Sequence, residues 1–130
     1  MKSAERLTLR DELIVPNPIE HLTSGTWTGY YTCAFTGIFS RLDPPMRSIK
    51  FEVTKEMSSS VEVRAINARD GVGRFNISLE VSKRDGRFHG EKKYEGNTRW
   101  EWYGMVTPFG VFASWGVDWY GGHIWLWKDS

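Results

Sequence analysis

The sequence has little of what usually marks a metal site or a disulfide-stabilised domain. Cys33 is its only cysteine, which excludes an intrachain disulfide and a zinc site built from several thiolates. The three histidines, His21, His89 and His123, are scattered along the chain and lack the spacing of a helical zinc site. There is also no glycine-rich phosphate loop and no serine nucleophile elbow. We therefore expect neither a metal nor a cofactor.

Long apolar runs and an excess of one charge are also absent. No segment is apolar over the length needed to cross a bilayer, and residues 1–6 lack the apolar stretch of a secretory signal. The 17 Lys and Arg residues nearly balance the 16 Asp and Glu residues, leaving a formal charge of +1. Such a balance argues against a nucleic-acid partner. We expect a soluble, cytoplasmic protein with no membrane or nucleic-acid partner, and the sequence does not indicate its oligomeric state.

Aromatic residues, in contrast, are abundant. They make up 15% of the chain, and 11 of the 19 lie between Tyr94 and Trp127. Aromatic side chains favour strands and bury large areas. Two interpretations stay open at this point: a tightly filled core with some cross-strand pairs, or a cavity lined by aromatic rings.

Two regions differ in their patterning. In residues 1–24 the apolar residues are loosely spaced, and Pro16 and Pro18 interrupt any regular element. We interpret this region as an N-terminal arm with one short helical turn, which packs on the rest or closes one end. From Gly25 the pattern alternates with the period of strands, so residues 25–130 are predicted to form a separate β domain.

The alternating region divides into about eight strands. Short turn signals such as Asp70-Gly71 and Asp85-Gly86 separate them, leaving no room for crossover helices. Successive hairpins favour an up-and-down antiparallel barrel, because closure removes the exposed sheet edges. The predicted strands are 26–35, 49–54, 61–65, 74–81, 88–94, 100–106, 111–115 and 123–127. The fold class is thus all-β, a single barrel whose interior is either filled or holds one small ligand.

Four segments carry a resemblance to a known family. Gly25-Thr26-Trp27 is similar to the glycine–any–tryptophan opening of lipocalin-like (calycin) barrels, and 70–75, 107–116 and 121–128 resemble uncharacterised fungal lipocalin-like domains. In that superfamily the tryptophan plugs one end of the barrel, a role that the resemblance implies for Trp27. Relatives bind retinoids, fatty acids, pigments or haem, and some barrels of similar shape catalyse cyclisations.

Alternation also proposes which side chains face the interior. If the barrel is hollow, the expected ligand-binding lining is aromatic, consisting of Trp27, Tyr31, Phe51, Phe75, Phe88, Tyr94 and Trp115. In strand 61–65 the valines are expected inward; a register shifted by one residue would instead bring Glu62 and Arg64 inside.

Lys92 is the most informative polar residue, because alternation places it on the same inward face as Phe88 and Tyr94. An ammonium among apolar groups is costly unless it is paired, and burial lowers its pKa. Lys92 therefore either binds a carboxylate ligand or, as the free amine, forms an imine with a carbonyl, or it snorkels to the rim or forms an internal ion pair. We expect Lys92→Met to retain the fold and to weaken ligand binding.

The candidate catalytic residues are Lys92, Tyr94, Tyr31 and Glu101. Lysine and tyrosine side chains inside an apolar cavity could polarise or protonate a bound molecule. Glu101 would join them as a base only if Trp100 and Trp102 lie on the outer surface.

Three functions remain open. The first is the binding of a small hydrophobic molecule in an aromatic-lined cavity. The second is a cofactor-independent cyclase or isomerase of secondary metabolism, in which the cavity folds a polyketide- or terpene-like substrate into a reactive conformer. The third is a protein-interaction domain, favoured if exposed tryptophans lie outside a filled core.

Overall fold

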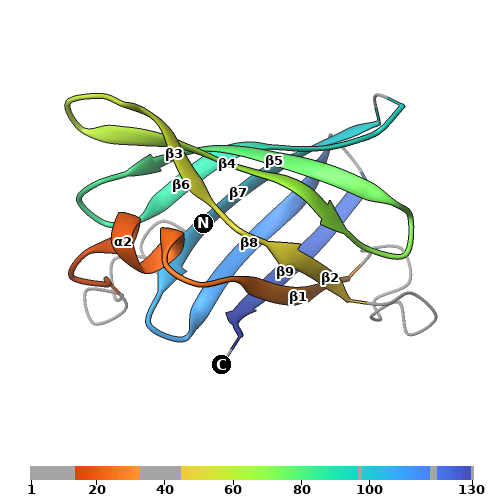
Figure 1. Cartoon of the computed structure of the whole chain (residues 1–130), viewed down its shortest axis with the longest axis horizontal. Helices are drawn as coiled ribbons and strands as arrows, with labels where there is room; N and C mark the ends of the chain where they lie inside the picture. Colours follow the sequence, from red (N-terminus) through yellow and green to blue (C-terminus); the bar gives the residue numbers. More distant parts are fainter. Residues whose placement is uncertain (1–13, 33–44, 97, 118–119, 130) are drawn as a thin grey trace.

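A computed structural model describes residues 14–32, 45–96, 98–117 and 120–129 of the chain. Within these residues it contains one short helix and antiparallel strands that curl into a barrel (Figure 1). The helix is α2 (Pro18–Thr23). The strands are β1 (Trp27–Tyr31), β2 (Met46–Ile49), β3 (Glu52–Glu56), β4 (Ser60–Arg69), β5 (Arg74–Ser82), β6 (Arg87–Tyr94), β7 (Arg99–Thr107), β8 (Gly110–Val117) and β9 (Tyr120–Lys128).

The strand order closes the sheet on itself. Neighbours run β2-β1-β9-β8-β7-β6-β5-β4-β3, and β2 also pairs with β4 through Arg47 and Arg69. Eight strands therefore form the closed barrel, and β3 is an extra strand paired with β4. The prediction of an all-β, up-and-down antiparallel barrel of about eight strands is confirmed.

The strand predicted at 49–54 is divided, and this part of the prediction is wrong in detail. The chain bends at Lys50 and Phe51, so that β2 pairs with β1 whereas β3 pairs with β4. Because the bend interrupts the alternation, Ile49 and Phe51 are buried but Val53 is 48% exposed. Because of the bend, β2 closes the barrel and β3 continues outside it, paired with β4.

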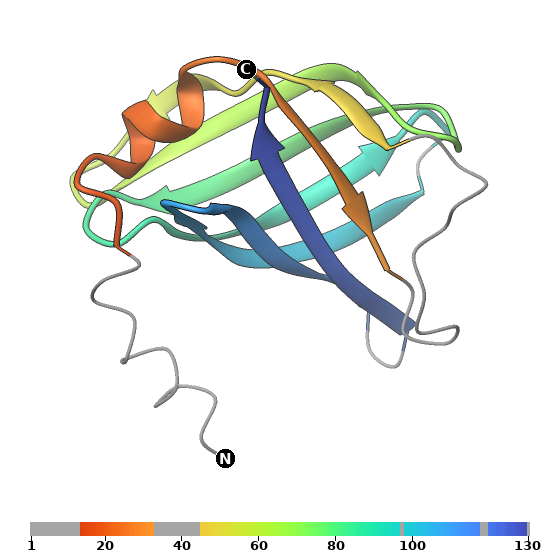
Figure 2. The same ribbon diagram turned by 90° about the horizontal axis from the view of Figure 1, so that it is seen from below.

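Helix α2 closes one end of the barrel (Figure 2). Asn17 caps the helix by accepting a hydrogen bond from the Glu20 amide, and Pro18 occupies its first turn, where a missing N–H is tolerated. Leu22 is fully buried, and its carbonyl accepts a 2.9 Å hydrogen bond from Nε1 of the equally buried Trp27. The helical turn expected in the N-terminal region is thus present. The predicted domain boundary after residue 24 stays a prediction, because residues 1–13 lie outside the described part of the chain.

The core follows the period of the strands. In β5 every second residue from Phe75 to Val81 is buried, and in β4 Val61, Val63 and Ala65 are buried while Arg64 is exposed. The favoured register of strand 61–65 is therefore confirmed. The Asp85-Gly86 hairpin is also present, and Gly86 has a φ of 78°, which glycine adopts without strain. The part of the first predicted strand beyond Thr32, including Cys33, lies outside the described residues.

Among the described residues, no helix is both long enough and apolar enough to cross a membrane.

Candidate functional site

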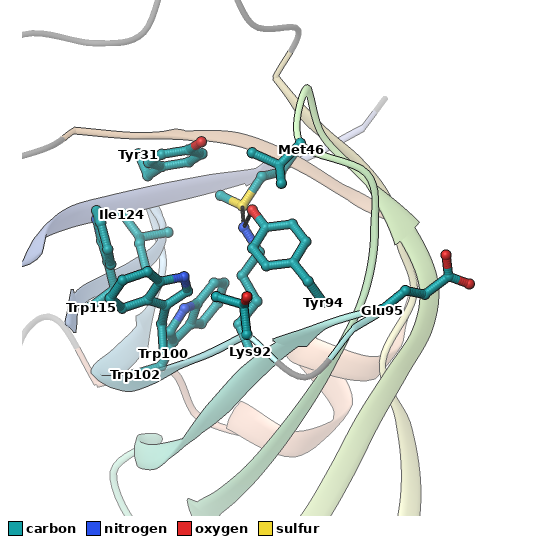
Figure 3. Close-up of a pocket in the computed structure, with 11 residues that line it drawn as sticks. Tyr31, Met46, Lys92, Tyr94, Glu95, Trp100, Trp102, Trp115 and Ile124 are labelled. Atoms are coloured by element: carbon teal, nitrogen blue, oxygen red, sulfur yellow. Dashed lines mark hydrogen bonds between the residues drawn. The ribbon is translucent and has the colours of Figure 1, made fainter. Parts of the chain in front are cut away.

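A cavity of about 290 Å³ lies inside the barrel at the end opposite α2 (Figure 3). Side chains from six strands and two hairpins surround it, and its rim contains the exposed residues Val72, Glu95 and Thr98, so it reaches the surface there. Its volume is close to the lower end of the ~300–1,000 Å³ range of small-molecule pockets. The lining consists of Tyr31, Met46, Val72, Lys92, Tyr94, Glu95, Thr98, Trp100, Trp102, Trp115 and Ile124.

Aromatic rings form one wall of the cavity. Trp100 and Trp115 meet edge to face at 5.1 Å between ring centroids, and Tyr31 meets Trp115 in the same way at 5.7 Å. The indole Nε1 of Trp115 donates a 2.8 Å hydrogen bond to the Thr32 carbonyl, which fixes the ring. This wall is preorganised, because each ring is held by a neighbouring ring or by the backbone.

The cavity brings together four residues that the sequence proposed: Tyr31, Lys92, Tyr94 and Trp115. Four others lie in the packed core and do not line it. Phe51, Phe75 and Phe88 are at most 5% exposed, and Trp27 is buried at the closed end beneath α2. The predicted lining residues therefore divide between the packed core and the wall of the cavity.

At the edge of the cavity Lys92, Asp70 and Tyr94 form a buried network. The Lys92 ammonium donates 2.7 Å hydrogen bonds to Oδ2 of Asp70 and to the Tyr94 hydroxyl, which itself donates to the same Asp70 oxygen. The side chains of Lys92 and Asp70 are only 5% and 0% exposed. A third contact, of 3.6 Å, joins the ammonium to Sδ of Met46. Lys92 thus has a partner for each of its three N–H groups.

Aromatic rings also surround the ammonium. Its nitrogen lies 4.2 Å from the ring centroid of Phe75, 4.5 Å from that of Tyr94 and 5.0 Å from that of Tyr31. A cation over ring faces is attracted to their electron density, and the attraction increases when water is excluded. Phe75, proposed as a ligand contact, instead contributes to holding Lys92.

Burial and charge act in opposite directions on this network. Burial lowers the pKa of Lys92, although the Asp70 carboxylate opposes this shift. Burial by itself would raise the pKa of Asp70, but the charge of Lys92 and the hydrogen bonds from Lys92, Tyr94 and the Val72 amide bring it below its usual value. Burial and then the neighbouring Asp70 raise the pKa of Tyr94 well above its usual value. Tyr94 is therefore a neutral phenol.

Glu101 lies outside the cavity. It is exposed on β7, where it accepts a 2.9 Å hydrogen bond from Tyr103, whereas Trp102 beside it is buried. Glu101 would have faced inward only if the two neighbouring tryptophans were on the outside. Because Trp102 points inward, the alternation places Glu101 in solvent, away from Lys92 and Tyr94.

Asp70 is the charged site residue that the sequence pattern did not identify. It was interpreted only as part of a hairpin signal, and it does hold the turn: its Oδ1 accepts hydrogen bonds from the amides of Val72 and Gly73. Its second oxygen points into the barrel toward Lys92. A buried inward lysine was itself a signal that a carboxylate partner exists. Met46, Trp100, Trp102 and Ile124 were also missing from the proposed lining.

A row of aromatic side chains lies on the outer surface of β1, β9 and β8. Tyr30 contacts Trp127, Trp127 contacts Trp125, and Trp125 stacks on Phe112 with the ring centroids 6.1 Å apart. Tyr30, Trp125 and Phe112 are between 36% and 43% exposed. The aromatic excess of the sequence is thus shared between the core, the cavity and this outer row.

Comparison of the chain with known protein families, with curated protein sequences and with solved structures finds no match. The class of protein is therefore defined by the fold, an eight-stranded antiparallel β-barrel that is consistent with a lipocalin-like architecture. Within the described residues, no three histidine, cysteine, aspartate or glutamate side chains group as metal ligands.

Proposed function

We propose that this protein is a lipocalin-like barrel of the calycin superfamily that binds a small, mostly apolar molecule. The observation that carries the proposal is the aromatic cavity at the end of the barrel opposite α2. It combines a largely apolar lining with a few convergent polar groups, which is the usual composition of small-molecule sites. The rings are held in place before a ligand arrives, so binding would not have to order them.

The volume of the cavity limits the size of its ligand. At about 290 Å³ it suits a compact molecule of two or three fused rings, and a long acyl chain would have to extend past the rim. A naphthalene derivative is therefore a suitable probe, and its affinity can be measured by isothermal titration calorimetry.

A cavity-filling variant tests the location of binding. Ile124 is buried and projects into the cavity from β9 (Figure 3), so Ile124→Phe would occupy space that the probe needs. We expect it to weaken binding of 2-naphthamide by about tenfold or more, equivalent to roughly 1.4 kcal/mol. The matched control is Phe112→Leu on the outer surface, which should leave the affinity unchanged. Equal affinities for all three proteins, or no binding to the unaltered protein, would contradict the proposal.

A second candidate function uses the same cavity. Lys92 and Tyr94 lie on its wall. From there, the two side chains of a cofactor-independent cyclase or isomerase would polarise a bound substrate. The raised pKa of Tyr94 makes it a poor proton donor, and Lys92 already has a carboxylate partner. Both features support binding over acid–base catalysis. Incubating the protein with the small molecules of its own host and measuring their masses distinguishes the two. A product of altered structure supports the enzyme, and an unaltered retained molecule supports the carrier.

The protein-interaction interpretation required exposed tryptophans outside a filled core. The outer aromatic row supplies exposed aromatic residues, but the core is not filled, because the barrel contains a cavity. We therefore propose the binding function in its place.

A further inference from the structure

We propose that the cavity selects uncharged ligands that carry a hydrogen-bond-accepting oxygen, and that Asp70 is the residue that sets this selection. The inference rests on the proposed binding function and names the chemistry of the ligand. It is drawn from the partners of Lys92, the only cation among the described residues that line the cavity.

A lysine inside an apolar cavity would ordinarily attract an anion such as a carboxylate. Here the counter-charge is already supplied by the protein, because Asp70 lies 2.7 Å from the ammonium and both side chains are buried. A second carboxylate would lose its hydration on entering the cavity without finding an unpaired cation. It would also experience repulsion from Asp70 at short range in a poorly screened environment.

The three N–H groups of Lys92 form hydrogen bonds of unequal strength. Two donate to oxygen atoms at 2.7 Å, whereas the third donates to the Met46 sulfur at 3.6 Å. Thioether sulfur is a weak acceptor, and methionine has three rotatable bonds with which to move aside. Met46 also lines the cavity, with its sulfur beside the ammonium (Figure 3).

A ligand oxygen could therefore replace the Met46 sulfur on Lys92. The exchange would give a hydrogen bond from a charged donor to a neutral oxygen, and it would leave the Lys92–Asp70 pair intact. Bonds of this kind are stronger than those between neutral groups. An amide, ketone or ester carbonyl meets both requirements, since it is uncharged and is a good acceptor.

Three probes of nearly the same shape separate charge from hydrogen bonding. They are 2-naphthamide, which is neutral with an acceptor oxygen, 2-naphthoate, which is anionic, and 2-isopropylnaphthalene, which has neither. Calorimetric titration of the unaltered protein should give the tightest binding for the amide, by about tenfold over each of the other two. Binding of the anion as tight as that of the amide would overturn the inference while leaving the binding function intact. If none of the probes binds, the proposed function fails and the inference fails with it.

Asp70→Asn tests the assigned residue by a gain of function. Asparagine can still accept the turn amides of Val72 and Gly73, but it leaves the Lys92 cation without a counter-charge. We expect affinity for 2-naphthoate to rise by about tenfold or more. The matched control is the double variant Asp70→Asn/Lys92→Met, which removes both charges and should reject the anion as the unaltered protein does. An Asp70→Asn protein that folds and still rejects the anion would overturn the role of Asp70. If that variant does not fold, the inference is still overturned by an unaltered protein that binds the anion as tightly as the amide.

Discussion

The ammonium of Lys92 and the carboxylate of Asp70, 22 residues apart in the chain, meet at 2.7 Å inside the barrel. Lys92 comes from the C-terminal half of β6 and Asp70 from the hairpin between β4 and β5. The contact therefore ties a hairpin at the open end to the barrel wall, next to the cavity. It links the stability of this end of the fold to the chemistry of the proposed site.

The first prediction concerns the cost of breaking this pair. With Asp70 as its partner, Lys92→Met leaves a buried carboxylate uncompensated, and we expect a loss of about 3–5 kcal/mol in the free energy of unfolding. The sequence alone predicts that this variant retains its fold, because strand alternation does not place Asp70 beside Lys92. The double variant Asp70→Asn/Lys92→Met should recover most of the loss. Urea denaturation measures both, and a double variant as unstable as the sum of the two single variants would contradict the pairing.

The second prediction concerns acid. The pKa of Asp70 is lower in the folded protein than its usual value of 3.8, so the folded state holds this carboxylate ionised more strongly than the unfolded chain does. The resulting stabilisation is present above the unfolded pKa and is lost as the pH falls through the folded pKa. Between about pH 5 and pH 2 the free energy of unfolding should therefore fall more steeply for the unaltered protein than for Asp70→Asn. If the free energy of unfolding falls equally with pH in the two proteins, Asp70 is not the source of the acid sensitivity.

The third prediction concerns Met46. Leucine has nearly the same volume but no sulfur, so Met46→Leu should change the free energy of unfolding by less than about 1.5 kcal/mol. It frees one N–H of Lys92 for a ligand oxygen. Affinity for 2-naphthamide should therefore rise, while that for 2-isopropylnaphthalene should stay the same. A parallel change for both probes would mean that Met46 affects only the shape of the cavity.

The period of two, together with the turn residues, was sufficient to predict the barrel. Burial follows the alternation from Val61 to Ala65 in β4 and from Phe75 to Val81 in β5, and the same rule places Lys92 inside. Alternation does not apply where a strand bends or ends: Val53 lies two residues after the buried Phe51, yet it is exposed beyond the bend. Asp70 escaped prediction for the same reason. Its inward direction depends on the turn that its own Oδ1 stabilises and on the bulge between Ala65 and Ala68.

The cavity itself was less predictable than the barrel. The sequence identifies inward aromatic residues, but it does not say which of them pack against one another. Phe51, Phe75 and Phe88 fill the interior, whereas Tyr31 and Trp115 leave space beside them. That division depends on how side chains from different strands pack against one another, which is a tertiary relationship beyond the reach of strand patterns.

The central claim, that small apolar molecules bind inside the open end of the barrel, is tested most directly by the indole N–H resonances of the tryptophans. These side chains report on three separate places: Trp100 and Trp115 line the cavity, Trp27 lies at the closed end, and Trp125 lies on the outer row. Titration with 2-naphthamide should shift the indole signals of Trp100 and Trp115 in a saturable manner and leave those of Trp27 and Trp125 in place. A shift confined to Trp125, or no saturable shift at Trp100 and Trp115, would contradict the claim.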